Sequence, residues 1–163
     1  MKKKAFVLMA FLCVAAISKA HGFGIGAQLN FSAGSIFAPG AALLISPSDR
    51  THLAINWYLG SGKENIIGLT LDAVPLTLPI IRGDVATFNF NLGVGLFFNA
   101  ILSDNFGING GLRVPVGFNL LLGKDVFEIF THVAPSFGVN LLPSMGLSRP
   151  FYPIALGARI WFR

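Results

Sequence analysis

A small number of charged or nucleophilic side chains stand in otherwise apolar stretches of this sequence. They are Asp72, Arg113, Glu128, His132, Ser136 and Arg159. An ion held away from bulk water is costly unless an opposite charge and hydrogen bonds compensate it. We therefore expect Asp72 to pair with Arg113 in the interior of the fold. We expect a second interior pair of Glu128 with Arg159, with His132 in the same charge network; the alternative is that interior water solvates each charge separately.

Glu128, His132 and Ser136 also suggest an acid, a base and a nucleophile, because all three fall on one face of an extended strand. Four residues of strand, however, span about 13 Å. Short hydrogen bonds between these side chains are therefore excluded, and we expect no catalytic site and no enzyme. The three histidines have no spacing typical of metal ligands, so we also expect no metal ion and no cofactor.

The stretch 153–163 indicates which kind of element positions these side chains. Its apolar residues alternate with small or polar ones, which is the period-two pattern of a β-strand. One face carries Ile154, Leu156, Ala158, Ile160 and Phe162, and the other carries Ala155, Gly157, Arg159 and Trp161. A strand this late in the chain has to pair, and pairing with the first strand would remove the free edges of the sheet.

Seven further stretches alternate in a similar way. Six of them cover 23–31, 37–46, 52–59, 88–98, 108–120 and 126–141, and the seventh begins at 66. In the stretch 37–46 both faces are apolar. Opposite the apolar face stand mainly Gly, Asn, Gln, Ser and single charges. This small polar set could not coat the outside of a water-soluble eight-stranded barrel. We therefore place the apolar face outside, and we expect Tyr58, Phe97, Phe130 and Trp161 to fill part of the interior.

The chain begins with the features of an export signal. Three consecutive lysines precede an apolar run over 5–17, and small residues stand at Ser18 and Ala20, where a signal peptidase reads them. The run has about 13 residues, whereas a spanning helix needs about 20, so a retained anchor is the less favoured alternative. We expect cleavage after Ala20, with 1–20 as the signal peptide and 21–163 as one barrel domain.

Removal of this signal changes the charge of the chain. The full sequence has 12 Lys and Arg against 7 Asp and Glu, a formal net charge of +5. Four lysines lie within 1–20, so eight basic residues remain against seven acidic ones, a net charge of +1. A nearly neutral chain does not support nucleic-acid binding. The single cysteine, Cys13, leaves with the signal, which excludes disulfides and thiolate metal sites.

The remaining chain is too apolar for an ordinary secreted domain. Only 12% of the full sequence is charged, against about 25% in soluble domains, yet no stretch after Ala20 gives a long uninterrupted apolar run. Only helices and closed barrels satisfy every backbone group in lipid. We therefore predict an all-β fold, an eight-stranded antiparallel up-and-down transmembrane β-barrel. Polar turns at 47–50, 82–87 and 123–125 would face the periplasm, and connections near 32–38, 60–65, 101–106 and 142–151 would face outward.

The alternating last strand, the short charged turns and the segments GLRVPVGF and EIFTHVAPSFG resemble the small eight-stranded outer-membrane barrels related to the OmpA transmembrane domain, OmpX and OmpW. The resemblance covers the whole mature chain and implies a bacterial outer-membrane protein that is exported through the periplasm. It also implies that the apolar face of the last strand is an assembly signal for the barrel-insertion machinery. In this chain Arg163 follows Phe162, where those proteins usually end on the aromatic residue.

We expect an integral outer-membrane barrel with a structural, surface-adhesive or host-ligand-binding role and a packed lumen that is not an open pore. A narrow channel for small hydrophobic molecules is the alternative, and a lipid-modifying enzyme is a weaker one. The expected partners are outer-membrane lipids, the insertion machinery and a host or extracellular ligand at the outward loops. Nucleic acid is not expected as a partner, and the barrel should be a monomer.

Overall fold

A computed structural model describes residues 22–34, 39–59 and 65–162, and these ranges contain strands but no helix. The strands are β1 (Phe23–Gly34), β2 (Pro39–Ser48), β3 (Thr51–Leu59), β4 (Asn65–Arg82), β5 (Ala86–Leu102), β6 (Gly107–Arg113), β7 (Val116–Leu122), β8 (Phe127–Val133), β9 (Ser136–Leu142), β10 (Gly146–Leu147) and β11 (Phe151–Phe162). In the described part of the chain, no helix could span a membrane. The predicted signal peptide, its cleavage site at Ala20 and the predicted strand positions 37–38 lie outside the described residues.

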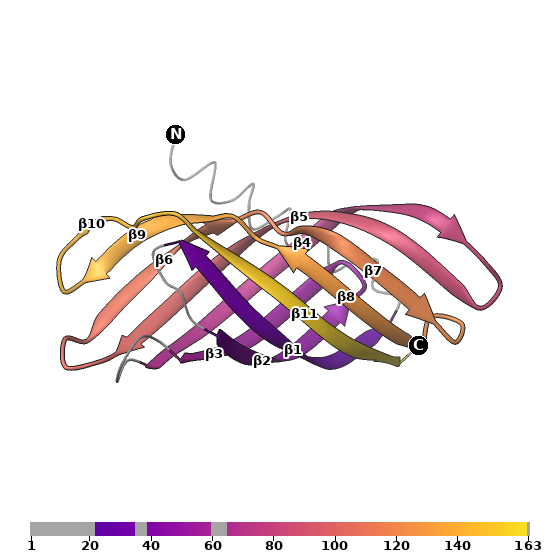
Figure 1. The fold of residues 1–163 in the computed structure, drawn as a ribbon, viewed down its shortest axis with the longest axis horizontal. Coiled ribbons are helices and arrows are strands. Elements are labelled where there is room, and N and C mark those ends of the chain that lie inside the picture. The colour runs from indigo at the N-terminus through magenta and orange to yellow at the C-terminus, as the bar shows by residue number, and fades with distance from the viewer. Residues whose placement is uncertain (1–21, 35–38, 60–64, 163) are drawn as a thin grey trace.

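The strands form one antiparallel sheet that closes on itself (Figure 1). β1 to β5 pair in chain order, β5 pairs with both β6 and β7, and these pair with β9 and β8. Closure comes from β11, which pairs with β1 from Phe23 opposite Phe162 to Gly34 opposite Phe151. On its other side β11 pairs with β8, so the last long strand joins both ends of the sheet.

Two strands of the barrel are interrupted by proline, which has no N–H for the ladder. Val114 and Pro115 separate β6 from β7, and Ala134 and Pro135 separate β8 from β9. Val114 N–H still donates to the Pro135 carbonyl at 3.0 Å, and Ala134 N–H donates to the Pro153 carbonyl at 2.8 Å. β6 with β7 and β8 with β9 therefore count as one strand each, and the predicted eight-stranded antiparallel barrel is confirmed.

The two faces of the wall are inverted relative to those of a water-soluble protein. Large apolar side chains are exposed on the outside, for example Leu43 at 68% and Trp57 at 56%. The largest fully buried side chains are Asn30, Asn56, Ser46, Ser48 and Ser136. Apolar side chains can therefore contact lipid while polar groups bond to one another inside, as predicted from the alternation.

The two ends of the barrel differ in their connections. At the end where β1 begins and β11 finishes, the strands are joined by short turns at 49–50, 83–85 and 123–126, and we call it the turn end. The described connections of the opposite end, the loop end, are 103–106 and the longer 143–150. Short turns face the periplasm in bacterial barrels. That the turn end is periplasmic and the loop end faces outward stays a prediction.

The turn end is uneven because β4 is much longer than β3. The last residue of β4 that pairs with β3 is Ala73, whereas β4 continues to Arg82 and pairs there with β5 alone. Residues 75–82 are all exposed, and the β4–β5 hairpin extends beyond the adjacent strands (Figure 1). Pro75 and Pro79 suit this position, since proline in a sheet is confined to edges, strand starts and bulges. Beyond the β2–β3 turn, β4 thus has no neighbour among the described strands on its β3 side. We call this gap in the ladder, between the β2–β3 turn and residues 75–82, the notch.

Candidate functional site

The lumen has two halves of different chemistry, and the half toward the loop end, the loop half, contains bonded amides. Gln28 Nε2 donates to Asn30 Oδ1 at 2.7 Å, and Asn30 Nδ2 donates to Asn56 Oδ1 at 2.9 Å. Between β5 and β6, Asn99 Nδ2 donates to Asn109 Oδ1 at 3.0 Å. Such bonds make buried amides tolerable, because an unsatisfied polar group costs its full desolvation.

Aromatic and aliphatic side chains fill the space around these amides. Phe97 and Phe151 meet edge to face, with ring centroids 5.1 Å apart, and Tyr58 packs with Ile66 and the partly buried Ile101. On the described strands, the inward side chains of this half carry no charge. The loop half is therefore closed by ring packing and neutral hydrogen bonds.

The half toward the turn end, the turn half, holds the charges. Arg113 Nε lies 3.3 Å from Asp72 Oδ1, which is close enough for an ion pair, although the two atoms are not aligned as a hydrogen bond. The side chains meet across Gly95, which pairs with Asp72 on one side and with Arg113 on the other. A β-carbon at Gly95 would overlap the Asp72 carboxylate, so glycine makes room for the ion pair. Arg113 Nη2 also donates to His132 Nε2 at 3.1 Å, and this ring nitrogen must accept because a guanidinium only donates.

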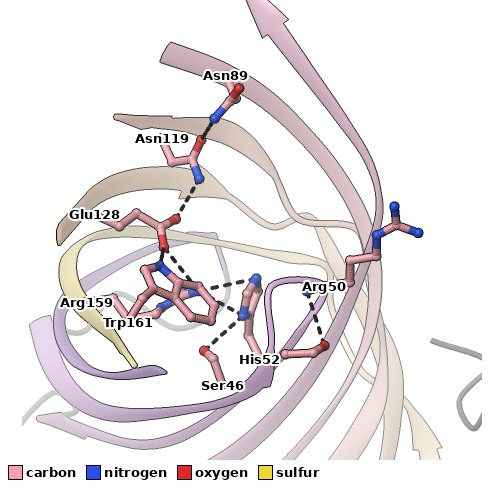
Figure 2. A network of polar contacts seen from close by, with 9 residues as sticks. Ser46, Arg50, His52, Asn89, Asn119, Glu128, Arg159 and Trp161 are labelled. Carbon is pink, nitrogen blue, oxygen red and sulfur yellow. Dashed lines mark hydrogen bonds and ion pairs between the residues drawn. The ribbon is translucent and has the colours of Figure 1, made fainter. Parts of the chain in front are cut away.

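A second group surrounds Glu128, and Figure 2 shows its contacts. Glu128 accepts a hydrogen bond from Asn119 Nδ2 through Oε1 and one from Trp161 Nε1 through Oε2, both at 2.7 Å. Its Oε2 also lies 3.5 Å from Nη1 of Arg159, its direct cross-strand neighbour. Both carboxylate oxygens are thus engaged, which is the condition under which a buried charge is tolerated.

Arg159 on β11 also connects this group to His52 on β3, on the other side of the seam between β11 and β1. Its Nη1 donates to His52 Nδ1 at 2.9 Å, and Ser46 Oγ lies 3.0 Å from the same ring nitrogen. The guanidinium carbon also lies 4.9 Å from the ring centroid of Phe130 and 5.1 Å from that of Trp161, distances at which cation–π attraction acts. The polar contacts follow the lumen wall as an arc over several strands (Figure 2).

The turn half also contains a cavity of about 200 Å³. The two ion pairs line it together with hydroxyl and amide side chains of β4 and β5, among them Thr77, Asn89 and Asn91. Five exposed residues are among those that line the cavity: Asp49 and Arg50 on the β2–β3 turn, Thr77 on β4, Phe118 on β7 and Thr131 on β8. The first three stand on the two sides of the notch, so the cavity opens there.

The structure thus brings Asp72, Arg113, Glu128, His132 and Arg159 into one half of the lumen, with each acid beside the arginine named for it from the sequence. A role for this network beyond stability stays a prediction. Sequence reasoning missed His52, Asn119 and Trp161 as members of the network. Their alternation does place all three on the inward face, but nothing in the pattern shows which inward side chains meet.

Glu128, His132 and Ser136, the candidate acid, base and nucleophile, do not form a hydrogen-bonded catalytic triad. Ser136 Oγ donates to the Ala134 carbonyl at 2.8 Å, whereas Glu128 and His132 have the arginine and amide partners given above. Within the described ranges, no group of three or more His, Cys, Asp and Glu residues could hold a metal ion. The absence of enzymatic activity stays a prediction.

The predicted assembly signal lies on the outer face of β11. Its exposure ranges from 40% at Ile154 through 53% at Leu156 and 48% at Ile160 to 57% at Phe162, and Ala158 is half-buried. This strand face is free to contact lipid. Its recognition by the insertion machinery stays a prediction.

No family model matches the chain, and no curated protein matches it. Similar folds occur among solved structures. The N-terminal β-barrel domain of Pseudomonas aeruginosa OprF is 16% identical, with a TM-score of 0.41, over 87% of this chain and 100% of that one. Neisserial surface protein A is 13% identical, with a TM-score of 0.45, over 86% and 96% of the two chains. Ail, the attachment invasion locus protein of Yersinia pestis, is 13% identical, with a TM-score of 0.41, over 86% and 97%.

These similarities concern the fold alone. A closed antiparallel ladder with an apolar exterior and a polar interior is the form in which β-sheet crosses the bacterial outer membrane. This chain has all three features. It therefore has the fold of an eight-stranded outer-membrane β-barrel.

Proposed function

We propose that the protein is a closed structural barrel that binds a surface or host ligand at its loop end, and that it is neither an open pore nor an enzyme. The observation that carries the proposal is the filled loop half, in which bonded amides and packed rings occupy the lumen. An eight-stranded barrel encloses little more than its own side chains. This layer therefore supports a lumen that is closed to steady ion flow.

The alternative of a narrow channel for small hydrophobic molecules has less support, because the inward surface is polar. An apolar solute would have to pass Asn30, Asn56 and Asn99, whose exposures are 1%, 1% and 5%. Passage would break amide hydrogen bonds without replacing them, which leaves buried polar groups unsatisfied.

Exposed apolar side chains at the loop end support the binding role. Met145 is 84% exposed and Leu147 is 87% exposed in the last connection, and Phe106 is 48% exposed in the connection 103–106. Met145 and Phe106 stand in the connections between strands, and Leu147 stands in β10, opposite Val139 of β9. Exposed apolar groups favour contact with a protein or a lipid surface. We propose that these side chains contact the ligand.

The same structure supports the proposed partners. The apolar exterior suits outer-membrane lipids, and the exposed face of β11 suits recognition by the insertion machinery. Pairing of β1 with β11 within one chain supports a monomer, since a second copy is not needed for closure.

The closed lumen can be tested by planar-bilayer recording of the refolded mature protein. The wild type should pass no steady current. Phe97→Ala, which removes a ring from the loop half, should raise the current, whereas Phe98→Ala on the outer face of the same strand should not. A large and stable conductance of the wild type would contradict the proposal.

The loop-end surface can be tested separately by cell attachment. Cells that display the barrel with Met145→Ser and Leu147→Ser should attach to host cells or extracellular matrix less well than cells with the wild type. The matched control is Val85→Ser, because Val85 is 75% exposed at the opposite end of the barrel. Equal attachment by all three proteins would remove the adhesive role.

A further inference from the structure

We propose that the cavity of the turn half binds a small zwitterion, a molecule of the amino-acid type that carries a carboxylate and an ammonium group close together. The site lies at the opposite end of the barrel from the loop-end surface. It therefore goes beyond the function proposed above and does not depend on it.

The proposal starts from hydrogen-bond donors that the protein leaves unused. Arg113 contacts its neighbours only through Nε and Nη2, and Arg159 contacts polar atoms only through Nη1. Within the described part of the chain, Arg113 Nη1 and Arg159 Nη2 have no protein acceptor. Both residues line the cavity, so these N–H groups can bond only to water or to an incoming acceptor. A carboxylate is the acceptor that a guanidinium fork matches best.

Asp72 supplies the complementary acceptor. Its Oδ1 faces Arg113, whereas its Oδ2 has no donor among the described residues. A positive and a negative group thus stand side by side on the cavity wall. An α-amino acid presents the same two charges on neighbouring groups, so it can lie against the pair with its carboxylate toward Arg113 and its ammonium toward Asp72.

The balance of charge in the cavity also favours a molecule without net charge. Arg113 and Arg159 are balanced by Asp72 and Glu128, and at the entrance the arginine of the β2–β3 turn is balanced by the aspartate beside it. A simple anion or cation would leave an uncompensated charge in a confined space, where charges are poorly screened. A zwitterion keeps the balance.

Size and access fit the same class of ligand. The cavity volume of about 200 Å³ equals that of about seven waters at about 30 Å³ each, and it is below the range of sites for drug-sized ligands. One amino acid fits this space, and a long peptide does not. The entrance between Asp49 and Thr77 lies at the turn end, so the ligand would arrive from the periplasm.

The test is isothermal titration calorimetry on the refolded barrel in detergent micelles. The three probes are L-alanine, propionate and ethylammonium. They share a two-carbon skeleton, which carries both charged groups in L-alanine, only the carboxylate in propionate and only the ammonium group in ethylammonium. L-alanine should bind saturably and more tightly than either of the others. No saturable heat with L-alanine, or equal affinity for propionate, would overturn the proposal.

Asp72→Asn separates a binding role from a structural one. The variant removes the partner of the ammonium group, so L-alanine affinity should fall about tenfold while propionate affinity stays or rises. If Asp72 had only a structural role, Asp72→Asn would lower the affinities for L-alanine and propionate alike. That result would count against the proposal. The control is Asp84→Asn in the exposed β4–β5 turn, which should leave both affinities unchanged.

A pair of variants at the entrance keeps the test independent of the ion pair. Thr77→Trp places a large ring at the mouth of the cavity and should abolish L-alanine binding. Leu78→Trp, one residue further along the same strand and facing outward, should bind as the wild type does. Unchanged binding by Thr77→Trp would show that the heat comes from another place on the protein.

Discussion

The loop half and the turn half of the lumen are built by the same strands but stabilise their buried polar groups differently. In the loop half, the Asn30 amide donates to Asn56, which donates in turn to the Ala54 carbonyl and the Thr70 hydroxyl. An amide carries both donors and acceptors, so a short chain of amides satisfies itself in a narrow space. In the turn half, each guanidinium only donates and each carboxylate only accepts. The charged half therefore keeps unused groups beside a cavity, whereas the neutral half closes.

Glycine makes both arrangements possible. Gly95 lies between Asp72 and Arg113 on adjacent strands, and a β-carbon there would overlap the carboxylate. Gly157 lies between Gln28 and Phe130 in the same way, and a β-carbon there would overlap the Phe130 ring. The glycines of the inward face thus provide the space that the large neighbouring side chains occupy.

The largest effect is expected where a charge in the turn half loses its partner. Arg113→Ala should lower the free energy of unfolding by about 3 to 5 kcal/mol, because Asp72 remains buried and uncompensated. The double variant Asp72→Ala with Arg113→Ala should be less destabilised than the single one. Urea unfolding in lipid vesicles measures both, and additive effects would show that the two side chains are not coupled.

A smaller loss of stability is expected when a charge is placed on the lipid-facing exterior. This loss should not depend on whether the site lies beside the loop half or the turn half. Val94→Lys should cost about 2 to 4 kcal/mol if its site lies near the bilayer midplane. Phe23→Lys, at the end of the barrel, should cost less. Lysine scanning along β5 should show a period of two; a flat profile would mean that this strand does not face lipid on one side.

Crowding of the Asp72–Arg113 ion pair should lower the free energy of unfolding by a smaller amount. Gly95→Ala should reduce stability by about 1 to 3 kcal/mol, the usual range for overpacking. Gly146→Ala is the matched control, since a β-carbon at Gly146 meets nothing within 4 Å. Equal stability of the two variants would show that Gly95 is not required between Asp72 and Arg113.

The smallest effect is expected in the neutral half. A double-mutant cycle with Phe97→Leu and Phe151→Leu should give a coupling of about 0.5 to 1.5 kcal/mol, the range for edge-to-face rings. Unfolding curves of the four proteins give this value. A coupling of zero would mean that the rings fill space without a specific contact.

The period-two pattern was enough to predict most strands and, where the two faces differ in polarity, which side chains point inward. It placed Arg159 and Glu128 inside, and their pairing could be proposed by counting from strand ends because both lie a few residues from the same end of neighbouring strands. Position along a strand says little about register across the barrel, and register decides which inward groups meet.

The notch and the cavity could not be predicted for this reason. The register shifts between Ala73 and Leu76, and β4 continues without β3 as a neighbour. Pro75 and Pro79 were the sequence signs of this irregular segment, but proline suits a bulge, an edge or a turn. The cavity is the volume that remains after register and side-chain packing are set, so no residue pattern specifies it.

The lumen should be closed toward the loop end and open toward the turn end. The predicted mature chain has no cysteine, so single cysteines can be labelled selectively. In cells with Asn91→Cys, a membrane-impermeant maleimide should label the cavity only after the reagent is admitted to the periplasm. Leu147→Cys should be labelled in intact cells. Labelling of Asn91→Cys from outside in intact cells would contradict the claim.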